Sequence, residues 1–342
     1  MKNNLRCRRP CFLDEQILDA LIFQNALIFS LFGSCRIQLG GNLLTGDAPR
    51  IVSAAVIPSP DKTRSEVWFL VVRIINGVTK QFIEYLTPEF EVNTPLEDAV
   101  FLDSSLTLDD PKQVFSATQA NPVVISTGLP HGFSNGNEVI FENVQGMTEL
   151  NDLPATQIDN VTSLTFELQG VDGTDFGETI PVDRAGVNKV RKLVGTITGL
   201  SHLEGETIQV VGDGLVQKDQ TVVSGSITLD TKAARVHVGY KYNSDCRLLN
   251  FDAGSATGTA LGKSQRTNRV GLSLDRTVDV KVGRDFTTMF SARPGKTDLF
   301  TGILTVQTNA DYQLGNKICL RQDSPLPGTI LAVMPGLTTQ DR

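Results

Sequence analysis

The sequence is poor in the residues that most enzymes use for catalysis. Its 342 residues include three histidines, and none of them accompanies a nucleophile motif or a metal-ligand spacing. The long C-terminal section lacks the 3.6-residue apolar period of an amphipathic helix, and no apolar segment is long enough to cross a bilayer as a helix. We therefore expect no catalytic site, no cofactor, little helix and no membrane span.

Cysteine is scarce, and its placement argues against disulfides. The five cysteines are Cys7, Cys11, Cys35, Cys246 and Cys319. Their number is odd, and a chain of this size does not need covalent cross-links to hold its core, so we expect reduced thiols. Cys7 and Cys11 have a loose metal-like spacing, but no second Cys or His pair lies nearby, so we expect no metal site there.

The chain also lacks an excess of positive charge. Its net charge of −7 argues against a surface that grips nucleic acid, because phosphate binding concentrates Lys and Arg on one face. A negative wall would instead repel DNA and let it slide past.

Residues 1–42 differ from the rest of the chain. A basic start precedes the apolar stretch Ala20 to Phe32, which ends shortly before Cys35. One interpretation is a bacterial lipoprotein signal with its lipid at Cys35. Acidic residues between the basic and apolar parts favour the other interpretation, a short amphipathic helix around Leu13 to Phe32.

What the chain does have is the pattern of short antiparallel strands. In residues 43–112, the segment EVWFLVVRII, the dipeptide Asn76-Gly77 and the segment VTKQFIEYL predict a β-hairpin with a type I′ turn. We expect Trp68, Phe82 and Tyr85 to pack on or beside this sheet. An acidic, loop-like linker from Pro88 to Asp110 follows the hairpin.

The remaining chain continues this pattern in two sections. Residues 113–190 and 191–342 both contain strands of a few residues separated by Gly, Asp and Ser turns. We expect an all-β fold of several small antiparallel barrel or sandwich modules, with a barrel-like module at 113–190, a C-terminal β domain at 191–342 and a minor N-terminal helix.

The histidines have simpler roles than catalysis. His131 lies in a Gly-Leu-Pro-His-Gly-Phe turn, which its ring is expected to fix by hydrogen bonding. His202 lies near Glu204 and Glu206, a combination that suits either a catalytic pair or a loop leading into a strand. His237 alternates with two valines, which predicts that it faces the opposite side of a strand.

Three further segments contain residues used in binding sites. Residues 254–262, GSATGTALG, resemble a nucleotide loop in composition but lack its Lys-Ser or Lys-Thr ending, so a loop is expected. Lys263, Arg266 and Arg269 form a basic cluster that suits a solvated loop edge or contact with DNA or an acidic neighbour. The run with Asp172, Asp175 and Glu178 suits a turn better than a calcium loop.

A resemblance to a known family rests on these segments, in order: SEVWFLVVRIINGVTKQFIEYL, HGFSNGNEVIFENVQGMTELN, GLSHLEGETIQVVGDG, SGSITLD, VHVGYKYNSD, VGLSLDRTVDVKVG, DLFTG and NKICLRQDSPLPGTILAVMP. From about Val52 to Asp341 the chain resembles the C-terminal part of the tail nozzle proteins of short-tailed bacteriophages, also called tail tubular protein B or stabilisation proteins. The second segment is similar to a module of phage tail proteins that is labelled after the FCCH domain of ubiquitin-activating enzymes. We expect no ubiquitin chemistry, because the chain has no adenylation loop.

This resemblance implies a structural virion protein of a phage or prophage, made in the bacterial host cytoplasm and located in the virion tail. It implies a homohexameric ring that touches the portal or adaptor and the tail fibres or spikes, with double-stranded DNA passing through without sequence-specific binding. Family members are about twice as long, so the resemblance also implies a C-terminal portion or a truncated copy. The alternative is a secreted or lipid-anchored carbohydrate-binding β protein; a polysaccharide depolymerase is the least favoured class.

Overall fold

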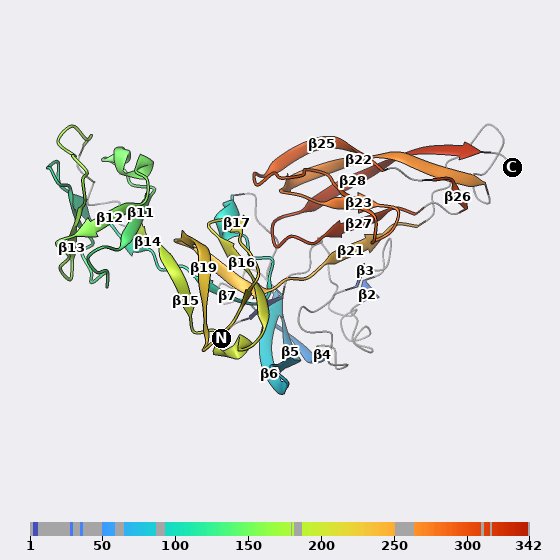
Figure 1. The fold of residues 1–342 in the computed structure, drawn as a ribbon, viewed down its shortest axis with the longest axis horizontal. Helices are drawn as coiled ribbons and strands as arrows, with labels where there is room; N and C mark the ends of the chain where they lie inside the picture. Colours follow the sequence, from blue (N-terminus) through green and yellow to red (C-terminus); the bar gives the residue numbers. More distant parts are fainter. Residues whose placement is uncertain are drawn as a thin grey trace. The chain divides into compact units, whose positions relative to one another are not determined.

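The fold is almost entirely β. The computed structural model describes residues 3–5, 28–29, 35–36, 50–58, 65–86, 93–178, 180, 187–249, 263–308, 311–314 and 317–340 (Figure 1). Within these residues the helical segments are the short 3-10 turns η2 (Leu96–Asp98), η3 (Thr148–Asp152) and η5 (Ser201–Leu203). No helix in the described ranges is long and apolar enough to span a membrane. The all-β prediction is confirmed.

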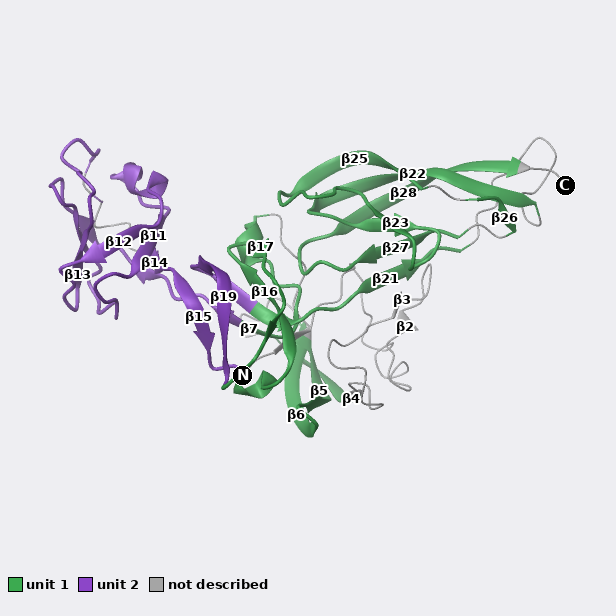
Figure 2. Cartoon of the chain, viewed as in Figure 1, with its two compact units in different colours: residues 1–106, 201–224, 238–342 green, residues 107–200, 225–237 purple. Residues whose placement is uncertain are grey.

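The chain divides into two compact units (Figure 2). Unit 1 consists of Met1–Leu106, Ser201–Ser224 and Val238–Arg342, and unit 2 consists of Thr107–Leu200 and Gly225–His237. Most of the helix expected at residues 13–32 lies outside the described residues. Ile28–Phe29 is described, and there the prediction was wrong: this β2 pairs with β3 (Cys35–Arg36), because extended backbone is satisfied by antiparallel pairing.

The predicted hairpin is present in unit 1. It belongs to a four-stranded sheet in the order β1-β6-β5-β4, formed by β1 (Asn3–Leu5), β6 (Val78–Leu86), β5 (Ser65–Ile75) and β4 (Arg50–Pro58). Asn76 and Gly77 connect the two long strands with φ angles of 49° and 73°, the positive values that a type I′ turn requires. Trp68 lies opposite Tyr85, and their rings stack with centroids 5.1 Å apart, as expected for aromatic residues packing on the sheet.

A second sheet lies mostly in unit 1, and its first strand along the chain follows the hairpin. Its strands are β17 (Leu215–Val216), β16 (Thr207–Gly212), β20 (Val236–Tyr240) and β7 (Asp103–Leu108), with β18 (Gln220–Thr221) paired to β16. Gly239 allows β20 to approach its neighbour closely, because an added Cβ would lie 2.6 Å from the carbonyl oxygen of Asp103. No larger residue fits this position without moving the backbone.

The C-terminal part of unit 1 is a β-sandwich. One sheet contains β21 (Ser244–Arg247), β27 (Cys319–Gln322), β23 (Lys281–Gly283) and β24 (Met289–Ser291). The other contains β25 (Phe300–Gln307), β22 (Ser264–Thr277), β26 (Gln313–Leu314) and β28 (Thr329–Gln340). Alternating residues of both sheets share one apolar core, formed by Val270, Leu272, Leu274, Val280, Val282, Val306, Ile318 and Leu320.

Unit 2 is built on a seven-stranded antiparallel arrangement. Its order is β8 (Lys112–Gln113), β14 (Lys189–Lys192), β11 (Glu138–Glu142), β12 (Thr156–Asp159), β13 (Thr165–Leu168), β10 (Val124–Ser126) and β9 (Ser116–Ala117). A separate ribbon pairs β15 (Val194–Thr198) with β19 (Ser226–Ala233). The described strands form no closed barrel, so the barrel-like form expected for residues 113–190 is not observed.

Candidate interaction surface

His131 fixes a turn in unit 2, as its sequence context predicted. The backbone N–H of Phe133 donates to His131 Nδ1 at 3.0 Å, and the ring packs against both Phe133 and Phe166. The side chain is 3% exposed. Burial lowers the pKa of His131, although backbone hydrogen bonds at Thr165 and Thr162 act in the opposite direction. This ring is therefore a structural element of the turn.

His202, Glu204 and Glu206 occupy a loop leading into a strand. His202 lies in η5, and β16 begins at Thr207. Each carboxylate accepts a backbone N–H: Glu204 from Ser224 at 2.8 Å and Glu206 from Asn76 at 2.9 Å. Glu206 thereby holds the hairpin turn of unit 1.

The other candidate residues also have structural partners. His237 is buried, and its Nδ1 lies 2.8 Å from Thr107 Oγ1. Asp172 accepts from both the backbone N–H and the hydroxyl of Thr174, which is a turn of the kind the sequence favoured over a calcium loop. Among the described residues, no group of three or more His, Cys, Asp or Glu side chains is placed to hold a metal ion.

Some residues that the sequence singles out are not among the described residues. Cys7, Cys11 and residues 254–262 lie outside the described residues, as does the side chain of Cys35. Cys246 and Cys319 are described, and neither is in a disulfide.

A buried ion cluster in unit 1 was not anticipated from the sequence. Arg73 forms two 2.8 Å bonds to Glu84 and one of 2.5 Å to Asp103, and all three side chains are at most 1% exposed. Burial acts to lower the pKa of Arg73, but the two carboxylates outweigh it and the pKa is raised. The available signal was an arginine inside an otherwise apolar strand, VVRII.

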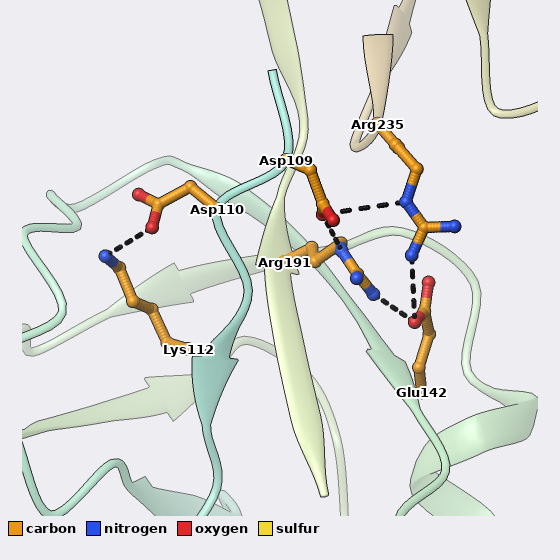
Figure 3. A network of polar contacts seen from close by, with 6 residues as sticks. All are labelled: Asp109, Asp110, Lys112, Glu142, Arg191 and Arg235. Carbon is orange, nitrogen blue, oxygen red and sulfur yellow. Dashed lines mark hydrogen bonds and ion pairs between the residues drawn. The ribbon is translucent and has the colours of Figure 1, made fainter. Parts of the chain in front are cut away.

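A second ion cluster joins four segments of unit 2 (Figure 3). Arg191 on β14 bonds Asp109 at 2.9 Å and also bonds Glu142, while Arg235 lies 3.5 Å from Asp109 and 3.8 Å from Glu142. Partial burial acts to raise the pKa of Asp109, but the two arginines outweigh it and the pKa is lowered. The cluster links the segment where the chain enters this unit, near Asp109, to the segment where the chain leaves it, near Arg235.

The feature that best fits a binding role is the outward side of the β25-β22-β28 sheet. We call it the outer sandwich face. Residues of three strands align across it: Ile303, Ser273 and Ala332 form one row, and Thr305, Gly271 and Met334 form the next. Its remaining members are Arg266, Arg269, Tyr312, Leu314, Leu331 and Gly336.

Large apolar side chains are exposed on this face. Ile303 is 69% exposed, Leu331 65%, Leu314 56% and Met334 42%. Ile303 and Met334 are next to the core residues Leu304 and Val333 on the same strands, so the pleat that fills the sandwich core presents these two side chains to the outside. Single exposed apolar residues are ordinary, but a group spread over adjacent strands is typical of an interaction site.

Glycines keep the middle of the face flat. Met334 lies across Gly271, where an added Cβ would be 3.3 Å from its side chain. Arg269 lies across Gly336, where an added Cβ would be 2.7 Å from its Cγ. Two larger residues here would force these side chains away from the sheet.

The two arginines of the predicted basic cluster belong to this face. Arg266 and Arg269 lie on β22, not on a loop edge, and this is a correction: the strand begins at Ser264 because β28 and β26 pair with it from that residue. The guanidinium carbon of Arg266 lies 5.0 Å from the ring centroid of Tyr312. Arg269 is exposed.

The composition of the outer sandwich face is that of a protein interface. Its four strands contain neither Lys nor Glu, and their one Asp, Asp275, accepts from Thr301 Oγ1 at 3.0 Å. Met, Tyr and Arg are enriched at interface centres, whereas Lys, Glu and Asp are depleted. We therefore take this face as the candidate interaction surface.

Comparison with known proteins finds a family match for one segment of the chain. Residues 119–181 match the family described as the ubiquitin-activating enzyme E1 FCCH domain. The comparison with curated proteins found no match. The matched segment contains β10, β11, β12 and β13 of unit 2 and most of its apolar core. The predicted similarity of residues 131–151 to this module is confirmed, so the chain carries an FCCH-like module within an all-β fold.

Proposed function

We propose that the chain is a structural subunit of the tail nozzle of a short-tailed bacteriophage or prophage, without catalytic activity of its own. The observation that carries the proposal is the outer sandwich face, where exposed apolar side chains and arginines occupy a flat sheet of interface composition. The ordered sequence resemblance supplies the identity of the assembly, and the FCCH-like match coincides with one of its segments.

Within this proposal the subunits form a closed homohexameric ring in the virion tail. Its neighbours are the portal or adaptor above and the fibres or spikes at its side, and double-stranded DNA passes through it. A net charge of −7 suits a wall that does not hold the DNA. A heterologous contact, in which two different patches of adjacent subunits meet, closes such a ring.

The test is the state of the purified full-length chain. Mass photometry and negative-stain microscopy are expected to show oligomers that include rings, alone or after mixing with the adaptor protein encoded by the same phage. Mass spectrometry of tails purified from induced cells is expected to detect the chain. A chain that stays monomeric with every tail partner and is absent from the particles would contradict the proposal.

A further inference from the structure

Charge is distributed very unevenly along the chain. The FCCH-like segment 119–181 contains no Lys or Arg but nine acidic residues: Glu138, Glu142, Glu149, Asp152, Asp159, Glu167, Asp172, Asp175 and Glu178. Residues 263–340 of the sandwich contain ten Lys and Arg and six Asp, for a net charge of +4. The two parts therefore attract each other electrostatically between separate copies of the chain.

One outward side of the module places two of these carboxylates opposite each other. Asp159 on β12 lies directly opposite Glu167 on β13, and the alternate residues Ile158, Phe166 and Leu168 are fully buried on the other side. We call the outward side of these strands, Gln157, Asp159, Thr165 and Glu167, the acidic module face. Like charges directly opposite each other on a sheet are destabilising.

Little within the module offsets this repulsion. Asn160 Nδ2 donates to Glu167 Oε2 at 2.6 Å, but the segment has no cation of its own. An arginine from outside would neutralise the pair and bond its oxygens, since guanidinium groups match carboxylates in geometry.

The outer sandwich face offers such arginines next to apolar surface. The guanidinium of Arg266 stacks on Tyr312, which restricts it before binding, and the stem of Arg269 lies across Gly336 on the same sheet. Ile303, Leu331 and Met334 provide apolar area beside them.

We propose that the acidic module face of one copy docks on the outer sandwich face of a second copy, with Arg266 and Arg269 meeting Asp159 and Glu167. This inference rests on the proposed homo-oligomer and names its contact. Because the two faces are different patches of one chain, the contact is heterologous and continues from copy to copy. Each copy uses its module on one neighbour and its sandwich on the other.

The experiment reverses the charge on each face separately. R266E/R269E and D159K/E167K are expected to weaken self-association of the full-length chain by about tenfold or more, as like charges then meet. Mixing the two variants is expected to restore association, because each reversed face finds its complement on the other variant. The chain carrying all four changes is expected to associate with itself. Analytical ultracentrifugation measures each case.

The matched control is K296E/K317E, which makes the same change in net charge at two exposed lysines outside the outer sandwich face. It is expected to leave association within about twofold of the wild type, because neither lysine belongs to either of the two faces and exposed charges are screened by salt. Raising the salt from 50 to 500 mM is expected to weaken the wild-type contact. If D159K/E167K does not fold by circular dichroism, D159N/E167N replaces it, with loss of this salt dependence expected.

The outcomes separate the contact from the assembly. An oligomer that forms equally well with every face variant, or variants that weaken it without rescue on mixing, would overturn the contact and leave the ring standing. A wild-type chain that remains monomeric at high concentration, and with tail partners added, would overturn both.

Discussion

At the scale of single residues, the largest expected changes in the free energy of unfolding come from removing one member of a buried charge cluster. Arg73 is enclosed with Glu84 and Asp103, and its guanidinium bonds both buried carboxylates. Breaking such a group by removing one partner is far more costly than never having had it, because a desolvated charge is left behind.

Replacing this arginine is therefore expected to destabilise unit 1 strongly. Arg73→Met removes the cation that bonds two buried carboxylates. The expected loss in the free energy of unfolding is about 3–5 kcal/mol. Urea denaturation followed by tryptophan fluorescence measures it, because Trp68 lies in the same strand. The control Arg269→Met, at an exposed position, is expected to stay within about 0.5 kcal/mol. Equal midpoints for the two variants would contradict this account.

The pH response of His131 follows from its burial. Its folded pKa is lowered, so the folded chain favours the neutral ring whose Nδ1 accepts from Phe133. That contribution to stability is complete above the unfolded pKa of about 6.5 and is lost as the pH falls from there through the folded pKa. NMR titration of the ring C–H signal, assigned by its absence in His131→Asn, is expected to give a midpoint below 6.5. A midpoint at or above that value would show that the charged ring is accommodated.

At the scale of elements, two glycines decide how the hairpin docks. Gly77 and Gly205 have φ angles of 73° and 78°, and an added Cβ on Gly205 would lie 3.1 Å from Cγ of Asn76. Gly77→Ala is expected to cost about 1–2 kcal/mol, from the left-handed conformation alone. Gly205→Ala is expected to cost at least as much, since it also crowds the turn. Gly195→Ala, with 3.7 Å to its nearest neighbour, is the control in urea denaturation and should change little.

Elements with local signals could be predicted from the sequence, whereas the surface they form could not. Asn76-Gly77 between two alternating segments determines a hairpin within about twenty residues of chain, and the prediction was confirmed. The partners of Arg73 lie 11 and 30 residues away, so no local pattern reveals them. Arg266 and Arg269 follow a glycine-rich segment that indicates a loop, and only pairing with β28 and β25 shows that they lie on a sheet.

At the scale of the whole molecule, two compact units with separate cores imply two unfolding events. The core of unit 2 is built from its own residues, around Phe141, Met147 and Phe166, and the sandwich core of unit 1 is separate from it. Compact units with their own cores commonly unfold one at a time, which breaks two-state behaviour for the whole chain.

The ion cluster of Figure 3 provides the means to test this separation. Arg191 is 2% exposed and bonds residues of two other segments of unit 2, whereas its partners Asp109 and Glu142 are partly exposed. Arg191→Met is expected to destabilise unit 2 by about 2 kcal/mol, the scale of lost hydrogen bonds to charged groups. Differential scanning calorimetry should show two transitions, of which one moves down by several degrees while the other stays in place. In Arg73→Met the other transition is expected to move. A single transition that shifts in both variants would show that the two units unfold together.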